Sequence, residues 1–249
     1  MVPSFSELEE LTDRAAGYSG YLYENELSEG YLTYGGAFRI GICTRNNSVH
    51  GGKITSLSVR IPCFNENAFP DKALRELLTF DRGILVAGPP GSGKTTLLRN
   101  IARGLSDGML GEYKKVCVAD ERGEFTADAS CGICTDVISG LKKSTAFIRA
   151  VRLFSPQYVI CDEIGAEEET KSLLEGLNSG IRFAASVHAG SVDELIRRKQ
   201  FRILFDENVF DRIVLLSAQT AGKIERIFTD GEVADEIHRC SGCLSCFQP

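Results

Sequence analysis

The sequence predicts an α/β protein: a core domain with a mostly parallel, doubly wound sheet, preceded by a small α+β domain. Three observations support this prediction. Short, almost purely apolar runs recur after residue 80, as expected of strands buried on both faces of a parallel sheet. Stretches with helical periodicity separate these runs. Before residue 62, apolar and polar residues instead alternate, as in strands with one solvent-facing side.

Composition limits the classes of protein that need to be considered. The 249 residues are 43% hydrophobic and carry a net charge of −6, which argues against disorder and against a dedicated nucleic-acid binder. Neither an apolar run of transmembrane length nor a signal peptide is recognisable, so we expect a cytoplasmic protein. The nine cysteines are odd in number and are expected to be reduced thiols.

Residues 1–70 are predicted to form the small α+β domain. Phe5, Leu8 and Leu11 have helical spacing, and two β-prone runs at 31–34 and 38–43 flank Gly35-Gly36 as in a hairpin. Residues 54–61 alternate apolar and polar side chains and predict a third strand, followed by a linker around 64–71.

Residues 71–230 are predicted to form the larger domain. A short helix over 73–78 is followed by alternating strands and helices, which is typical of a doubly wound sheet. The predicted strands lie at 84–87, 116–119, 158–161, 183–187 and 213–216, and helices are expected at 95–105 and 170–177.

A glycine-rich segment between the first of these strands and the helix after it matches the phosphate-binding pattern G-x-x-x-x-G-K-[ST]. Glycines let successive backbone N–H groups turn toward a phosphate, and the helix N-terminus adds partial positive charge. Lys94 is expected to reach the β- and γ-phosphates, and Thr95 to ligate Mg²⁺. This context makes the core a RecA-like P-loop domain, with nucleotide-binding residues Gly88, Pro89, Pro90, Gly91, Ser92, Gly93, Lys94, Thr95 and Thr96.

Two carboxylates, Asp162 and Glu163, directly follow the apolar strand predicted at 158–161. In P-loop enzymes an aspartate here holds Mg²⁺, and an adjacent glutamate can act as general base toward the attacking water. This pair favours hydrolysis of ATP to ADP and phosphate over phosphoryl transfer to a small metabolite. Neither an Asn-Lys-x-Asp nor a Leu-Ser-Gly-Gly-Gln sequence is present, which argues against a GTPase and a transporter cassette.

Two further strand ends carry polar residues. Asp120 and Glu121 follow the strand at 116–119, and His188 follows the strand at 183–187. Because ligands gather at the carboxyl ends of parallel strands, we expect these residues to join the site. His188 is a candidate for contacting the γ-phosphate or its water.

These motifs together resemble the stage III sporulation protein AA family, which is related to the secretion and pilus motor ATPases. The resemblance extends over about residues 15–230. It includes the Gly-Tyr-Leu-Thr and Gly-Gly-Ala-Phe-Arg-Ile-Gly segments at 30–41, Ser-Val-Arg-Ile at 58–61, the P-loop, Asp-Glu-Arg at 120–122, Asp-Glu-Ile-Gly at 162–165 and the segment around His188.

The resemblance implies an ATPase that assembles into a ring of identical subunits, expected to be a hexamer, and works at a membrane through protein partners. It implies that Lys94, Glu163, His188 and Glu121 serve catalysis, with Thr95 and Asp162 on Mg²⁺. It also implies candidate inter-subunit arginines, which contact nucleotide in a neighbouring subunit: Arg39, Arg60, Arg122 and Arg152.

The sequence departs from the family pattern at Cys134, where the family has an arginine before Thr-Asp-Val. Any charge role there is lost or taken over by Arg149 or Lys142. The tail, residues 231–249, has Cys240, Cys243 and Cys246 at a spacing compatible with Zn²⁺, but we favour a flexible, reduced tail.

Two alternatives remain open from the sequence. One is a scaffold that is gated by ATP binding without turnover. The other is a nucleic-acid helicase or loader, which the acidic net charge disfavours.

Overall fold

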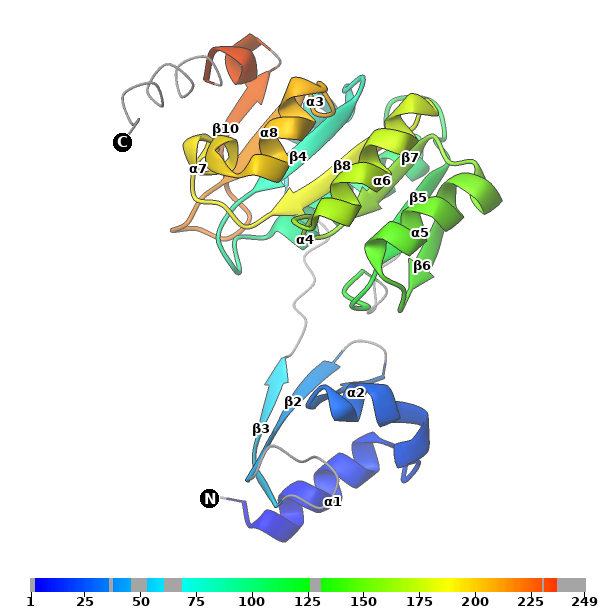
Figure 1. The fold of residues 1–249 in the computed structure, drawn as a ribbon, viewed down its shortest axis with the longest axis vertical. Coiled ribbons are helices and arrows are strands. Elements are labelled where there is room, and N and C mark those ends of the chain that lie inside the picture. The colour runs from blue at the N-terminus through cyan, green and yellow to red at the C-terminus, as the bar shows by residue number, and fades with distance from the viewer. Residues whose placement is uncertain are drawn as a thin grey trace. The chain divides into compact units, whose positions relative to one another are not determined.

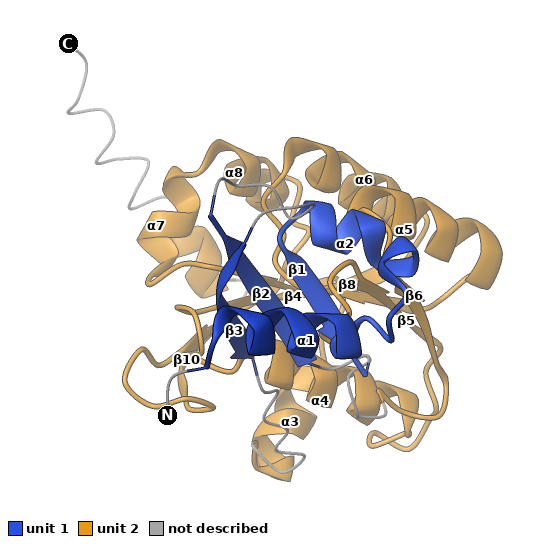
Figure 2. Ribbon diagram, turned by 90° about the horizontal axis from the view of Figure 1, so that it is seen from below, with its two compact units in different colours: residues 1–64, 126–128 blue, residues 65–125, 129–249 orange. Residues whose placement is uncertain are grey.

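A computed structural model describes residues 3–35, 38–45, 53–60, 69–125, 131–229 and 231–236. The chain divides into two compact units (Figure 2). Among the described residues, the first unit contains those up to Arg60 and the second those from Phe69 onward. Each unit has its own hydrophobic core.

The first unit is a three-stranded antiparallel sheet with helices. Its strands, in the order β1-β2-β3, are β1 (Tyr31–Tyr34), β2 (Phe38–Thr44) and β3 (Ile54–Arg60). Helix α1 (Phe5–Ala15) begins with a capping box between Ser4 and Glu7, and η1 (Gly20–Tyr23) and α2 (Glu24–Ser28) follow. Leu8 of α1 packs into a core with Leu27, Leu32, Ile42 and Ile54.

The second unit contains a seven-stranded sheet with the order β10-β9-β4-β8-β7-β5-β6. All neighbouring pairs are parallel except β9 and β10, which pair antiparallel. The strands are β4 (Gly83–Ala87), β5 (Val116–Asp120), β6 (Thr135–Ser139), β7 (Tyr158–Cys161), β8 (Arg182–Val187), β9 (Arg212–Leu216) and β10 (Ile224–Thr229).

Helices cover both faces of this sheet (Figure 1). One face is packed by α3 (Asp71–Leu78) and α4 (Lys94–Ser106). The other is packed by α5 (Lys143–Arg149), α6 (Glu167–Asn178), α7 (Val192–Arg197) and α8 (Lys199–Asp206), and a π-helical segment, η2 (Ala150–Phe154), extends α5.

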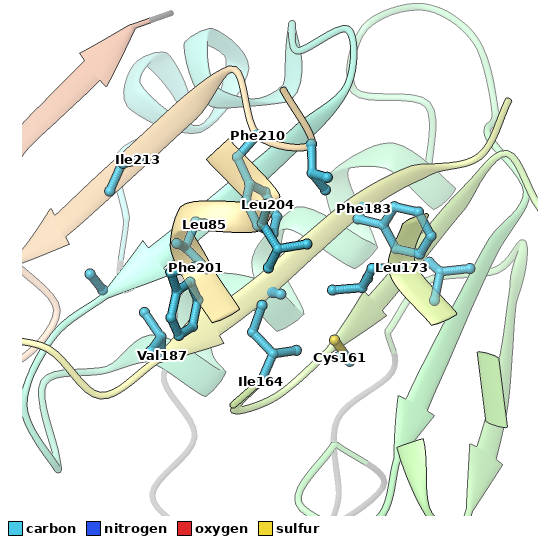
Figure 3. Close-up of a cluster of buried hydrophobic side chains, with 14 of the residues drawn as sticks. Leu85, Cys161, Ile164, Leu173, Phe183, Val187, Phe201, Leu204, Phe210 and Ile213 are labelled. Atoms are coloured by element: carbon cyan, nitrogen blue, oxygen red, sulfur yellow. The ribbon is translucent and has the colours of Figure 1, made fainter. Parts of the chain in front are cut away.

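Strand β4 shows why the sequence forms a three-layer structure. Its side chains alternate between the two cores: Leu85 and Ala87 face α5–α8, whereas Ile84 and Val86 face α3 and α4. Every residue of β4 is buried, which explains the purely apolar run. Figure 3 shows Leu85 in the first of these cores, among side chains that include Phe201 and Leu204 of α8.

The fold class predicted from the sequence is confirmed, and each of the five apolar runs forms a strand of the large sheet. The two strands at the sheet edges, β6 and β10, were not predicted as strands. Only Ile138 of β6 and Phe228 of β10 are buried, so neither strand has the apolar run by which the central strands were recognised.

Several predictions fall outside the described residues, namely those on Gly36, on residues 64–68 of the predicted linker and on the cysteines of the tail. The five cysteines that the structure does describe, Cys43, Cys117, Cys131, Cys134 and Cys161, are free thiols. No helix in the described part of the chain combines the length and apolarity that a membrane crossing requires.

Substitution of a central core residue should destabilise the second unit strongly. Leu85 is 0% exposed, so Leu85→Ala leaves a cavity and should lower the free energy of unfolding by about 2–5 kcal/mol, measured by urea denaturation. The control is Leu153→Ala, because Leu153 is 70% exposed and its truncation should change stability by less than about 0.5 kcal/mol. Equal losses in both variants would contradict this account of the core.

Candidate functional site

The glycine-rich segment forms a loop between β4 and α4, as the motif predicts. Gly93 caps α4 with φ of +98°, a left-handed conformation that side chains rarely adopt. At Gly88 a Cβ would lie 2.5 Å from Ser92 Oγ, so a side chain there would collide with the loop itself. The N–H of Gly222, from the β9–β10 connection, donates to Ser92 O at 2.9 Å and braces the loop.

Two polar groups of the loop are suited to receive an anion. Lys94 is buried, and its Nζ donates to the carbonyls of Gly88 at 3.0 Å and Pro89 at 2.8 Å. Burial lowers the pKa of Lys94, while the nearby carboxylates of Asp162 and Glu163 oppose that shift. Ser92 Oγ is buried without a hydrogen-bond partner among the described residues. Buried polar atoms are nearly always paired, so this hydroxyl fits a loop that closes on a ligand.

Asp162 links the loop to the centre of the sheet. Its Oδ2 accepts a hydrogen bond of 2.6 Å from Thr95 Oγ1, and its Oδ1 accepts a hydrogen bond from Ser186 Oγ of β8. Hydroxyl and carboxylate oxygens are the ligands that Mg²⁺ prefers in proteins. The two residues predicted to hold the metal are therefore adjacent, although they are 67 positions apart in sequence.

Glu163 lies beside Asp162 and has φ of +47°, which is uncommon for a residue with a side chain. Its carboxylate is held between two partners: Oε2 accepts from Arg122 Nη1 at 2.9 Å, and Oε1 lies 3.2 Å from His188 Nε2. The side chain is partly exposed, which leaves it accessible to water.

His188 connects Glu163 with Lys94. Its Nδ1 lies 3.1 Å from Lys94 Nζ. Because an ammonium can only donate, Nδ1 must accept, which assigns the ring hydrogen to Nε2 and directs it toward Glu163. A chain of polar contacts thus runs from Lys94 of the glycine-rich loop through His188 and Glu163 to Arg122.

The end of β5 contributes three carboxylates with different environments. Asp120 is buried, and its oxygens accept from the backbone N–H groups of Glu124 at 2.8 Å and Phe125 at 3.0 Å, which orders the following turn. Glu121 lies 3.7 Å from Lys143 Nζ. Burial, together with the neighbouring carboxylate of Asp162, raises the pKa of Glu124.

Three residues of this arrangement were missed by the sequence analysis: Glu124, Lys143 and Ser186. Glu124 and Ser186 belong to segments that were singled out for their neighbours, Glu121 and His188. Their position at or shortly after predicted strand ends was a usable signal, because ligands gather at the carboxyl ends of parallel strands. Lys143, at the start of α5, had no such signal.

The structure separates the four predicted arginines. Arg122 contacts Glu163. Arg152 is exposed on η2, away from any described contact with the loop. Arg39 and Arg60 belong to the first unit, where they are paired across β2 and β3, and the Arg39 guanidinium lies 3.9 Å from the centre of the Tyr31 ring.

The other residues singled out from the sequence have no described contact with Asp162, Glu163 or His188. Thr96 lies in the first turn of α4, and its carbonyl accepts from Asn100 Nδ2 at 2.8 Å. Cys134, at the departure from the family pattern, is exposed, and its N–H donates to Ser106 Oγ. Lys142, the residue before α5, and Arg149, the last residue of α5, are both exposed.

Solved structures with a similar fold include an ATPase and a pilus retraction motor. The Legionella pneumophila ATPase DotB matches 86% of this chain with a TM-score of 0.60 at 19% identity, and this chain spans 65% of it. The pilus retraction motor PilT, solved with bound ADP, matches 90% of this chain with a TM-score of 0.58 at 17% identity, and 72% of PilT is spanned. At these identities the likeness shows the fold.

Sequence comparison identifies closer relatives. Stage III sporulation protein AA of Bacillus subtilis (strain 168) is 33% identical over 254 residues, which covers 95% of this chain and 80% of the relative. The family model described as Sporulation stage III, protein AA matches residues 2–233. Since this match includes nearly the whole chain, the protein belongs to the stage III sporulation protein AA family.

Proposed function

We propose that this protein binds ATP with Mg²⁺ and hydrolyses it to ADP and phosphate. The observation that carries the proposal is the convergence of three strand ends. The loop after β4, Asp162 and Glu163 after β7, and His188 after β8 are joined by direct polar contacts of 2.6–3.2 Å. The PilT structure that carries ADP has a similar fold.

The residues present fit a nucleotide. The glycine-rich loop offers backbone N–H groups at the start of α4, and Ser92 Oγ is a buried group that needs a partner. Lys94 would exchange the loop carbonyls of Gly88 and Pro89 for phosphate oxygens, which are stronger acceptors for an ammonium.

The residues also fit Mg²⁺, with Thr95 and Asp162 as the protein groups that hold it. The cation supplies neutralisation of the charge on the terminal phosphates. It would also reduce the repulsion between the neighbouring carboxyl groups of Asp162 and Glu124.

Glu163 is the proposed general base. The water oxygen bonds to the γ-phosphorus while the bond to the β,γ-bridging oxygen breaks, and the water proton passes to the Glu163 carboxylate. ADP leaves with the electron pair of the broken bond. A carboxylate has about four lone-pair positions, so Glu163 can accept from water while it keeps Arg122 and His188. When a phosphate binds Lys94, the contact between Lys94 and His188 would change, and His188 would pass this change on to Glu163.

We further propose that the protein acts as a ring-forming motor of a secretion-like sporulation complex and reaches a membrane through protein partners. The proposal rests on the family and on the likeness to DotB and PilT. Arg39, Arg60 and Arg152 remain candidates for completing the site of a neighbouring subunit. An arginine added to a phosphoryl transition state can raise the rate by about 10³–10⁵-fold, so the isolated subunit should be slow.

Removal of the proposed base should separate binding from turnover. Glu163→Gln should lower the rate of phosphate release by about 10²–10⁴-fold, because the amide cannot accept the water proton. Saturating ATP should still raise the melting temperature of this variant by about 5–11 °C, as in the unmodified protein. The control is Glu168→Gln, an exposed residue of α6 whose substitution should leave turnover unchanged.

Other outcomes would refute the role of Glu163 or favour one of the two alternative functions. Unchanged turnover in Glu163→Gln would refute the role of Glu163. An ATP-induced melting shift without phosphate release, even in an assembled unmodified protein, would favour the scaffold alternative. Turnover that depends on added DNA at low salt would favour the helicase alternative.

Neutralisation of Glu124 should have a larger effect without the cation than with it. In EDTA, Glu124→Gln should raise the melting temperature by about 2–4 °C, because the amide places no second negative charge beside Asp162. This gain should shrink when Mg²⁺ and ATP are present. The control is Glu175→Gln, exposed on α6, and a lower melting temperature for Glu124→Gln in EDTA would contradict the carboxylate pairing.

Assembly should depend on nucleotide if neighbouring subunits complete the site. The mass of particles of the Glu163→Gln variant, measured by mass photometry with ATP and Mg²⁺, should correspond to a discrete ring, with six subunits of 27.2 kDa as the expected number. The matched sample in EDTA without ATP should contain smaller species. A monomer that persists with ATP and Mg²⁺ would contradict the ring.

A further inference from the structure

Lys143 is a buried cation that none of the roles above explains. It is the first residue of α5, and its side chain is 9% exposed. Lysines are rarely buried to this degree without partners, because removing an ammonium from water is unfavourable. The arrangement around Nζ therefore indicates what the residue does.

Three groups surround Lys143 Nζ. It donates to the main-chain carbonyl of Glu163 at 2.7 Å, and it lies 3.7 Å from a carboxylate oxygen of Glu121 and 3.6 Å from one of Glu169. Glu121 follows β5, and Glu169 lies in the first turn of α6. The short contact is the one to the Glu163 carbonyl, whereas the two carboxylates compensate the buried charge.

The backbone N–H groups of residues 163–166 are also hydrogen-bonded. Glu163 N–H donates to Ser186 Oγ at 2.9 Å, and Ile164 N–H donates to Ser186 O at 2.8 Å. The next two N–H groups, of Gly165 and Ala166, donate to Glu169 Oε2 at 2.8 and 2.9 Å. Segment 163–166 is thus held from both sides.

Such restraint is needed because Glu163 has φ of +47°. A residue with a Cβ is disfavoured in this region and persists there only where surrounding contacts determine its conformation. The orientation of the Glu163 carboxylate toward His188 and Arg122 follows from this backbone conformation. A released carbonyl would let the carboxylate rotate away from the loop.

We propose that Lys143 is a positioning residue that holds Glu163 in its left-handed conformation through the main-chain carbonyl and so aims the carboxylate at the attacking water. The inference rests on the proposed hydrolysis of ATP. Lys143 itself does not reach the loop in the described structure, so it should affect the chemical step without affecting ATP binding.

The kinetic test compares Lys143→Met with Lys171→Met, a control at a lysine of α6 whose side chain is 69% exposed. Lys143→Met should lower kcat by about 10–100-fold and leave KM and the ATP-induced melting shift unchanged. Lys171→Met should change neither. A kcat within 3-fold of the unmodified protein, or a raised KM at unchanged kcat, would overturn the proposal.

A double substitution tests whether Lys143 acts through Glu163. In the Glu163→Gln background, Lys143→Met should reduce the residual rate by less than 3-fold, because the group that it positions is already inactive. Losses that multiply would show that Lys143 acts independently and would overturn the proposal. If Lys143→Met does not fold, the double variant Lys143→Met/Glu169→Gln replaces it, because this variant also removes a carboxylate that would be left without its cation. The expected changes in kcat, KM and the residual rate are the same.

Hydrogen exchange supplies a readout that does not depend on turnover. In the nucleotide-free protein, Lys143→Met should accelerate amide exchange at 163–166 at least 10-fold while β4 stays protected. Unchanged exchange there would overturn the proposal. If the unmodified protein showed no turnover in any assembled form, the proposed hydrolysis would fail, and exchange alone would decide whether Lys143 holds this segment.

Discussion

The hydrogen bond between Thr95 and Asp162 is the contact on which the rest of the site depends. It joins the first turn of α4, the helix that follows β4, to the residue after β7. Strand β8 lies between β4 and β7 in the sheet. The bond is possible because β4, β8 and β7 are parallel, so their carboxyl ends meet at one edge. Ser186 of β8 fills the space between them and donates to the same carboxylate.

The balance of charge around this bond explains the remaining contacts. Carboxyl groups from β5 and β7 converge near the loop, and a cluster of like charges would be unfavourable without compensation. Arg122 pairs with Glu163, and Lys143 lies between Glu121 and Glu169. Glu124 neighbours Asp162, and burial together with that carboxylate raises the pKa of Glu124. Arg122 and Lys143 thus compensate part of the negative charge at this edge of the sheet.

His188 is the residue through which this edge would couple the proposed ATP binding to the proposed hydrolysis. The ring touches Lys94 through one nitrogen and Glu163 through the other. A change in the partner of Lys94 therefore alters the environment of Glu163 through a single imidazole. Neither contact requires a movement of the sheet, whose strands at this edge are buried and rigidly paired.

Local patterns in the sequence determined the central strands, the phosphate-binding loop and the pair Asp162-Glu163, because each depends on neighbouring residues: an apolar run, glycines at fixed spacing, or carboxylates after a strand. Only the tertiary structure decided that Glu124 meets Asp162, that Ser186 bridges two strand ends and that Lys143 reaches the Glu163 carbonyl. These contacts join residues 20 to 38 positions apart, and the order of the strands, which no local pattern encodes, brings them together.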